Sequence, residues 1–340
     1  MTQVVLSFKE VALTVSSNGL QYHSMRILLT ALLATCLVCA QERPISVILD
    51  TDIGDDIDDA LALSFALQSP ELKLLAVTTV LQDREGRASL AWKILSLFGR
   101  TDIPVGAGAE QPLIAPVRTG KVRQVEALGP LDHIPPGQIR GGIQLIVDTC
   151  LNAPGKVTIL AIGPATNIAL ALRAEPRIKE KIERIILMNG FFFKPGLEYN
   201  TRIDPEASAI VYGSGVPVTA VGLDVTMQCK LTAADMQRIE RSQLPSAQFL
   251  YKLIRIWNGG NDEKLPVLHD PLAVGVTFRP GLIGVAAGSV EVETRGEPNL
   301  TYGMTVLRRD ANGKIHVAEE VSSREFIDLF LNRVLEAPRK

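Results

Sequence analysis

Short apolar runs alternate with helical segments over most of the chain, and this alternation is the strongest constraint on its fold. Runs of this length are typical of strands that are buried on both faces. The expected strands lie at residues 45–49, 72–80, 103–106, 157–162, 185–188 and 216–223. Strands that are separated by helices pair in parallel, and the helices cover both faces of the sheet. We therefore expect an α/β fold with an open, mostly parallel central sheet and helices on both faces.

The C-terminal part of the chain has a different pattern. Residues 289–318 alternate between apolar and polar side chains, as small antiparallel strands do. A final helix is expected from Ser323, with Ser322 and Glu325 as a capping box, and a similar box is expected at Thr232 and Asp235. Because no linker or repeat divides residues 41–340, we expect a single domain there.

The first 40 residues do not follow the alternation. Residues 25–40 read MRILLTALLATCLVCA, with Arg26 before an apolar run and small residues before Gln41. This pattern is typical of a secretory signal peptide, and the run is short for a transmembrane span. Residues 1–24 precede the second methionine, and we interpret them as an over-called start or a disordered segment. The expected mature protein is secreted or periplasmic, with no membrane association after signal cleavage.

The charge of the chain limits its possible binding partners, and its cysteines limit its possible disulfides. The chain has 340 residues, a formal net charge of -2 and 21% charged residues. No basic block occurs, which argues against a nucleic-acid polymer as a partner. Beyond the signal peptide the cysteines are Cys150 and Cys229, which can form one disulfide or remain as two buried thiols.

Six aspartates lie between the first expected strand and the helix expected at residues 59–67, in the stretch VILDTDIGDDIDDALAL. Helix capping and the helix dipole account for two or three of them. They do not account for Asp50 and Asp52 at the strand end, where crowded carboxylates repel one another. A bound divalent cation removes this repulsion, and calcium prefers carboxylate and carbonyl oxygens. The cluster therefore predicts a cation site at the carboxyl end of a strand, where α/β sheets bind ligands.

A second fragment, HDPLAVG at residues 269–275, fits the same site. His269 and Asp270 stand at the start of an expected helix, with Pro271 in its first turn. Alone, this is an ordinary helix start. Together with the aspartate cluster, it makes Asp270 a candidate closing ligand for the cation and His269 a candidate acid or base.

Four segments of the chain, in this order, resemble the signature segments of the inosine-uridine-preferring nucleoside hydrolases. They are DTDIGDDIDDALAL at 50–63, VTILAIGPATNIALAL at 157–172, EYNTRIDPEAS at 198–208 and HDPLAVG at 269–275. The resemblance implies a nucleoside hydrolase-like catalytic domain over residues 41–340. It also implies calcium-dependent hydrolysis of the N-glycosidic bond of ribonucleosides to ribose and free base, as in nucleoside salvage. Family members are usually dimers or tetramers, so a homodimer or homotetramer is expected.

The resemblance also implies roles for single residues. Calcium binding is carried over to Asp52, Asp59, Asp270 and the backbone carbonyl of Ile162. The family motif runs D-T-D-P-G-x-D-D, and here two more residues follow Gly54. One alignment therefore makes Asp58 the general base for the attacking water and another makes it Asp56. His269 would protonate the leaving base. Contacts to the nucleoside are carried over to Asp83, Glu198, Asn200 and Met188.

Other function classes remain open from the sequence. A haloacid dehalogenase-like phosphohydrolase also begins with D-x-D at a strand end, but Gly54 stands where that motif requires Thr or Val. The main alternative is a non-catalytic or degenerate ribose- or nucleoside-binding protein. It is suggested by Asp83, where the family often has asparagine, and by the short loop before Glu198 with phenylalanines at 191–193. The sequence does not distinguish purine, pyrimidine and nicotinamide ribosides as substrates.

Overall fold

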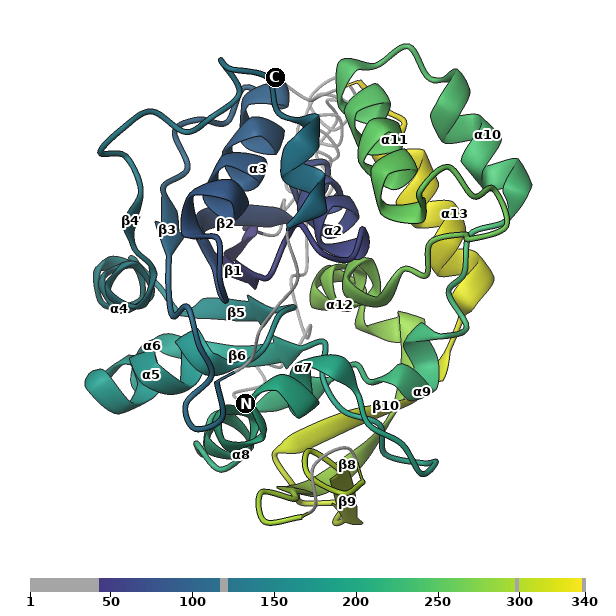
Figure 1. Cartoon of the computed structure of the whole chain (residues 1–340). Helices are drawn as coiled ribbons and strands as arrows, with labels where there is room; N and C mark the ends of the chain where they lie inside the picture. Colours follow the sequence, from purple (N-terminus) through teal and green to yellow (C-terminus); the bar gives the residue numbers. More distant parts are fainter. Residues whose placement is uncertain (1–42, 117–121, 297–299, 338–340) are drawn as a thin grey trace, which may run out of the picture. The chain divides into compact units, whose positions relative to one another are not determined.

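The computed structural model describes residues 43–116, 122–296 and 300–337 (Figure 1). The expected signal peptide at 25–40 and the segment 1–24 lie outside the described residues. From Pro44 onward the chain forms one compact unit. Within the described residues, no helix combines the length and hydropathy that a membrane span requires.

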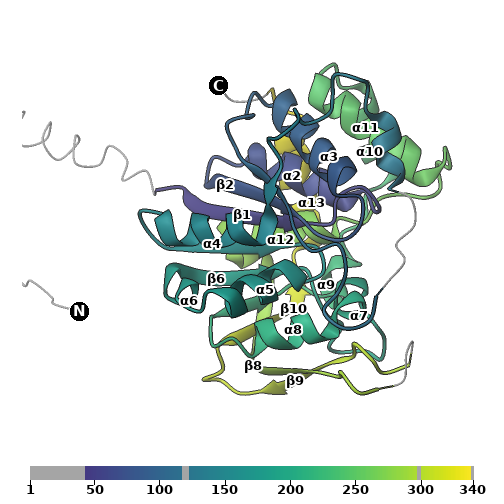
Figure 2. The same cartoon turned by 60° about the vertical axis from the view of Figure 1, so that its left-hand side comes forward.

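One sheet of ten strands is formed by the described residues, in the order β4-β3-β2-β1-β5-β6-β7-β10-β8-β9 (Figures 1 and 2). All neighbours from β4 to β10 in this order are parallel, whereas β8 pairs antiparallel with both β10 and β9. The expectation of an open, mostly parallel sheet is thereby confirmed, and the antiparallel C-terminal strands extend this same sheet. The strands are β1 (Ile45–Thr51), β2 (Leu72–Thr79), β3 (Val105–Ala107), β4 (Arg140–Gly141), β5 (Val157–Ala161), β6 (Ile182–Leu187), β7 (Val218–Ala220), β8 (Ile283–Val292), β9 (Thr305–Arg309) and β10 (Ile315–Val321).

Helices cover both faces of the sheet, as the alternation of strands and helices predicts. The α-helices are α2 (Asp58–Leu67), α3 (Arg84–Leu97), α4 (Gly142–Asn152), α5 (Thr166–Ala174), α6 (Ile178–Lys181), α7 (Tyr199–Ile203), α8 (Pro205–Tyr212), α9 (Leu223–Thr226), α10 (Ala233–Arg241), α11 (Pro245–Asn258), α12 (His269–Phe278) and α13 (Ser323–Val334). Short 3-10 turns form η1 (Arg123–Ala127) and η2 (Pro280–Leu282). Helices α2, α3, α11, α12 and α13 pack on one face, and α4, α5 and α8 on the other (Figure 1).

The central strand β1 shows why this arrangement follows from the sequence. Successive side chains of a strand point to opposite faces, so an apolar strand needs a hydrophobic layer on each side. Val47 and Leu49 belong to the core beneath α2 and α12, whereas Ile48 belongs to the core beneath α4 and α5. All three are fully buried. The carboxyl end of β1 is thus fixed between two helical layers.

The two predicted capping boxes have different outcomes. At α10, the Thr232 amide donates to Asp235 Oδ2 at 2.9 Å and the Asp235 amide donates to Thr232 Oγ1 at 3.2 Å, which confirms the box. Helix α13 begins at Ser323 as expected, but the Ser322 side chain makes no capping hydrogen bond, so that box is wrong. Glu325 instead forms an ion pair with Arg279 at 2.9 Å, which takes its side chain away from the cap.

Cys150 and Cys229 are both free and buried. Of the two alternatives left open by the sequence, the structure therefore has two separate thiols. Burial raises the pKa of each thiol to about 12, so neither is a thiolate at neutral pH.

Candidate active site

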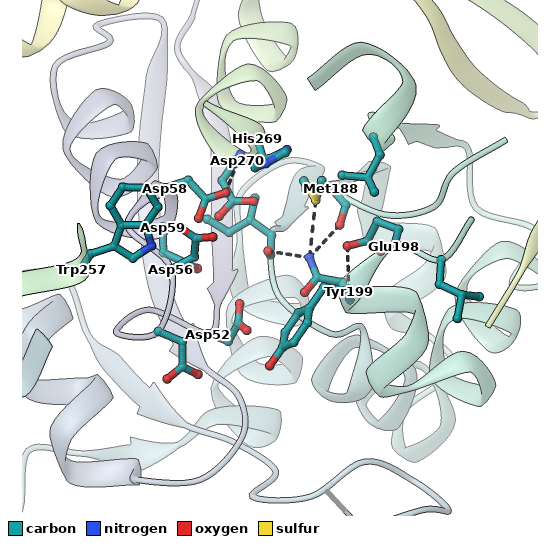
Figure 3. Close-up of a pocket in the computed structure, with 15 residues that line it drawn as sticks. Asp52, Asp56, Asp58, Asp59, Met188, Glu198, Tyr199, Trp257, His269 and Asp270 are labelled. Carbon is teal, nitrogen blue, oxygen red and sulfur yellow. Dashed lines mark hydrogen bonds between the residues drawn. The ribbon is translucent and has the colours of Figure 1, made fainter. Parts of the chain in front are cut away.

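A cavity of about 480 Å³ opens at the carboxyl ends of β1, β5 and β6 (Figure 3). The first turns of α2 and α12 and the segment around α7 complete its wall. The structure brings ten of the eleven sequence-predicted site residues to this one cavity. They are Asp52, Asp56, Asp58, Asp59, Ile162, Met188, Glu198, Asn200, His269 and Asp270.

The turn from β1 into α2 depends on Gly54. Its φ of 121° lies in the region that favours glycine. A Cβ at this position would also lie 2.2 Å from Val122 Cγ1, so a side chain has no space. Because the chain can turn here, the aspartates on both sides of Gly54 face the same cavity.

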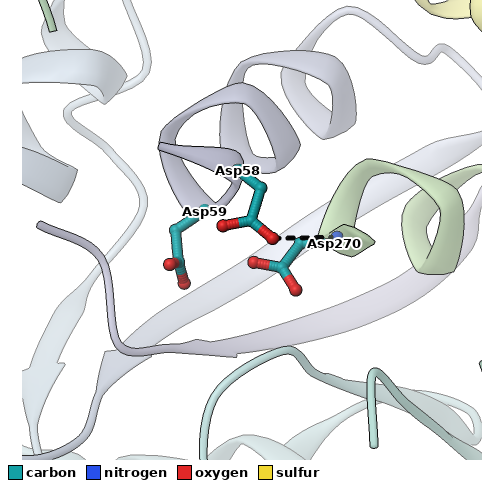
Figure 4. Close-up of side chains that lie close together, drawn as sticks. All are labelled: Asp58, Asp59 and Asp270. Atoms are coloured by element: carbon teal, nitrogen blue, oxygen red, sulfur yellow. Dashed lines mark hydrogen bonds between the residues drawn. The ribbon is translucent and has the colours of Figure 1, made fainter. Parts of the chain in front are cut away.

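Three buried carboxylates meet at the start of α2 and α12 (Figure 4). One oxygen from each of Asp58, Asp59 and Asp270 lies within 4.8 Å of the others, and we call this group the carboxylate trio. The Asp270 amide donates to Asp58 Oδ2 at 3.4 Å, and Thr51 Oγ1 donates to Asp59 Oδ1 at 2.5 Å. Asp270 Oδ1 is buried without a hydrogen-bond partner among the described residues.

Electrostatics makes the carboxylate trio unfavourable by itself. Burial raises the pKa of Asp58, Asp59 and Asp270 well above the usual range, and repulsion from neighbouring aspartates raises each further. A divalent cation would offset this repulsion and give the unpartnered Asp270 Oδ1 a partner. The donor set contains only oxygen, which suits a hard cation. The carboxylate trio can therefore bind a metal ion.

Asp52 lies in the same cavity but outside the trio. It is 6% exposed, and burial raises its pKa to about 7, with the charge of Arg87 acting in the opposite direction. The family resemblance assigns Asp52 to the cation and Asp58 or Asp56 to the general base. The structure instead groups Asp58 with the two other acids. Which acid fills which role stays a prediction.

Glu198 and Asn200 organise the opposite wall of the cavity. Asn200 Nδ2 donates to the carbonyl oxygens of Ile162 and Met188 at 3.0 Å each, which ties α7 to the ends of β5 and β6. The Glu198 carboxylate accepts from the amides of Asn200 at 2.7 Å and Thr201 at 2.8 Å, so it caps α7. In Figure 3, Met188 and Glu198 lie opposite the side that carries Trp257, Asp58 and Asp59.

Asp83 is the predicted site residue that the structure does not bring to the cavity. The chain turns from β2 into α3 at this point, and Asp83 has a φ of 64°, which aspartate tolerates. Its exposed side chain accepts from the Gly86 amide at 3.1 Å and caps α3. In this structure Asp83 is a helix cap.

His269 is held by one ring nitrogen. Its Nδ1 lies 2.7 Å from Thr226 Oγ1, a buried hydroxyl at the end of α9. Burial lowers the pKa of His269, while the nearby charge of Asp56 acts in the opposite direction. The contact leaves Nε2 as the ring nitrogen available to a bound molecule.

Sequence reasoning missed two residues that hold the loop between β1 and α2, residues 52–57, which we call the aspartate loop. Arg87 of α3 is fully buried, and its guanidinium donates to Asp55 Oδ2 at 2.6 Å, to the Ile53 carbonyl at 3.0 Å and to the Asp52 carbonyl. Gln124 of η1 donates through Nε2 to the Asp56 carbonyl at 2.5 Å. A single arginine in a helix gives no sequence signal of this role, because its partners are backbone carbonyls distant in sequence.

The family is decided by comparison with known proteins. The model of the family described as "Inosine-uridine preferring nucleoside hydrolase" matches residues 47–328. The chain belongs to this family. As the sequence indicates, it is thus a hydrolase acting on N-glycosyl compounds, and the phosphohydrolase alternative is excluded.

Relatives and solved structures extend this finding. The chain is 34% identical over 309 residues to the pyrimidine-specific ribonucleoside hydrolase RihA of Salmonella gallinarum, covering 85% of this chain and 97% of that protein. It is 31% identical to probable uridine nucleosidase 2 of Arabidopsis thaliana, covering 86% and 98%. The plant nucleoside hydrolase PpNRh1 superposes with a TM-score of 0.76 at 28% identity, covering 86% and 99%. A purine-preferring ribonucleoside hydrolase from Gardnerella vaginalis superposes with a TM-score of 0.73 at 28% identity, covering 85% and 98%.

Proposed function

We propose that the protein hydrolyses the N-glycosidic bond of ribonucleosides, giving ribose and free base, with calcium at the carboxylate trio. One observation carries the proposal. Three buried carboxylates, one of them with an unpartnered oxygen, lie in one cavity of a chain that belongs to the nucleoside hydrolases. A bound calcium ion would hold a water and the ribose hydroxyls and lower the pKa of the water.

The side chains of the cavity supply the remaining functions. Asp58, Asp59 and Asp270 would hold the ion, with the Ile162 carbonyl at the same cavity wall. Departure of the base builds positive charge on the sugar, and the surrounding carboxylates stabilise it. Asn200 and Met188 line the wall against which the ribose would lie.

The general base is an aspartate in this proposal. Asp58 and Asp56 are the sequence-based candidates, and the geometry adds Asp52 and favours it. Asp52 faces the cavity and lies outside the trio, and in the metal-free protein burial raises its pKa to about 7, in the direction that suits a general base. His269, held through Nδ1 by Thr226, would donate a proton from Nε2 to the leaving base.

Calcium is expected to raise the melting temperature more at about pH 8 than at about pH 5. In the metal-free fold the pKa values of the trio are raised, so their stabilising contribution is present at low pH and is lost as pH rises. Calcium binds the deprotonated acids and removes this loss. Thermal unfolding with calcium and with a chelator across this range checks the prediction. A calcium-induced rise in melting temperature that is the same at both pH values would contradict the prediction.

The substrate test is ribose release from purine, pyrimidine and nicotinamide ribosides by the protein from Gln41 onward. Release that requires calcium supports the proposal and ranks the bases. Binding of nucleosides without ribose release from any of them would instead support the alternative, a ribose- or nucleoside-binding protein.

Export is a further part of the proposal, and it rests on the sequence of residues 25–40. We expect the full chain, expressed in a host with a secretory pathway, to be recovered outside the cytoplasm with Gln41 as its first residue. Intact mass spectrometry of the fractionated protein measures this. Recovery in the cytoplasm with residues 25–40 still attached would refute export.

A homodimer or homotetramer is proposed as the assembled form. Light scattering after size-exclusion chromatography measures this. A monomer at assay concentration would refute it.

A further inference from the structure

The cavity carries more negative charge than the proposed reaction requires. Seven carboxylate side chains line it, and no lysine or arginine does among the described residues. The carboxylate trio, Asp52 and Glu198 account for five of the seven. The remaining two are Asp55 and Asp56, which lie among the three residues that separate Gly54 from the Asp58-Asp59 pair, where the family motif has one residue.

The two added carboxylates differ in their surroundings. Asp55 is paired with the buried Arg87 guanidinium at 2.6 Å, so its charge is largely compensated. Asp56 is exposed, and its Oδ1 accepts a hydrogen bond from the Ile57 amide at 2.6 Å. Asp56 lines the same cavity as the carboxylate trio, so its charge acts on a molecule bound there.

Asp56 acts on the side of the cavity that would receive the leaving base. His269, the proposed proton donor to that base, lines the same cavity as Asp56. Trp257 lines the same cavity, and Figure 3 shows it on the side of Asp56, Asp58 and Asp59. An aromatic ring beside a carboxylate attracts a planar cation, because the ring face and the carboxylate both carry negative potential.

We propose that this site prefers N-ribosides whose base is a cationic heterocycle, such as a pyridinium ring, over ribosides of neutral or anionic bases. The inference rests on the proposed nucleoside hydrolase function and narrows its substrate class. Asp56 is the residue that produces the preference.

The reaction balances without a proton donor. The bond between C1′ and the ring nitrogen breaks, and its electron pair goes to that nitrogen, which makes the ring neutral. The water oxygen bonds to C1′ and gives its proton to the general base, so the products are ribose, a neutral heterocycle and one proton. Positive charge therefore leaves the ring as it begins to form on the sugar, beside the same carboxylates.

The test compares two pyridinium ribosides that differ in charge. Nicotinamide riboside is a cation, whereas nicotinic acid riboside carries an added carboxylate and has no net charge. We expect kcat/KM for nicotinamide riboside to exceed kcat/KM for nicotinic acid riboside by about tenfold or more. Asp56→Asn should reduce this ratio of the two kcat/KM values by about three- to tenfold. The control is Asp148→Asn, which changes the charge equally on the exposed surface of α4, away from the cavity, and should leave the ratio unchanged.

A second experiment uses the unaltered protein, so that the inference can be tested even if the Asp56→Asn variant is inactive. Raising sodium chloride from about 20 mM to about 200 mM should lower the ratio, because salt screens the field of an exposed carboxylate. The inference is overturned if the protein hydrolyses uridine but the ratio of kcat/KM for the two pyridinium ribosides changes neither with salt nor in an active Asp56→Asn variant. Failure to hydrolyse any purine, pyrimidine or pyridinium riboside overturns the proposed function itself.

Discussion

Asp52→Asn is expected to lower kcat for ribonucleoside hydrolysis by about 10²–10⁴-fold while calcium still raises the melting temperature. Asparagine keeps the shape of the side chain but cannot accept the proton of the attacking water. Asp52 is buried at the cavity and lies outside the carboxylate trio, so its loss leaves the three acids of the trio in place. Single-turnover kinetics and thermal unfolding with calcium measure the two effects separately.

Asp59→Asn is the matched comparison, since it makes the same chemical change within the carboxylate trio. It is expected to weaken the calcium-induced stabilisation together with turnover. Asp58→Asn decides the remaining assignment. One result would contradict the assignment of Asp52 as the general base. In that result, Asp58→Asn abolishes turnover but is still stabilised by calcium, whereas Asp52→Asn is no longer stabilised by calcium. Asp58 would then be the base and Asp52 a calcium ligand, as the family resemblance implies.

Arg87→Ala is expected to lower the free energy of unfolding by about 3 kcal/mol and to reduce activity as well. Arg87 is fully buried, and its removal leaves the Asp55 carboxylate and the carbonyls of Asp52 and Ile53 without their donor. The side chain of Asp55 is 27% exposed, so water compensates part of the loss and the estimate is set at the lower end. Displacement of the loop also moves Asp52, which explains the expected loss of turnover.

Chemical denaturation and steady-state kinetics measure the effects of Arg87→Ala. The control is Arg324→Ala, which removes an exposed ion pair between Arg324 and Asp328 and should change neither quantity appreciably. Stability and activity close to those of the unaltered protein after Arg87→Ala would show that the loop does not depend on this residue.

The sequence predicts the fold well for strands and helices that bury either one face or all of their side chains. The apolar run at 45–49 becomes β1, and the helix predicted at 205–212 is α8 (Pro205–Tyr212). The exceptions involve competing partners for a polar side chain. The Glu325 side chain pairs with Arg279 instead of closing a capping box, because a residue distant in sequence lies within reach. A local pattern contains no information about such a partner.

The candidate site was predictable to the extent that its residues lie in recognisable segments. Ten of the predicted residues line one cavity because their segments end at the same edge of a parallel sheet. Asp83 follows β2 at that same edge, but the helix beginning there needs a cap, and the side chain serves it. Arg87 and Gln124 were unpredictable, since they bind backbone carbonyls whose position depends on the complete fold.

Calcium dependence is measured most directly by calcium titration of one chelated sample, with ribose release from uridine and bound calcium followed together. We expect no release in the chelated protein and a rise in activity that follows the filling of a single site. In Asp59→Asn, the curve of bound calcium and the curve of activity should both move to higher calcium concentrations. Ribose release that persists after complete chelation, or a filled site without release from any riboside, would contradict the claim that the carboxylate trio makes this protein a calcium-dependent nucleoside hydrolase.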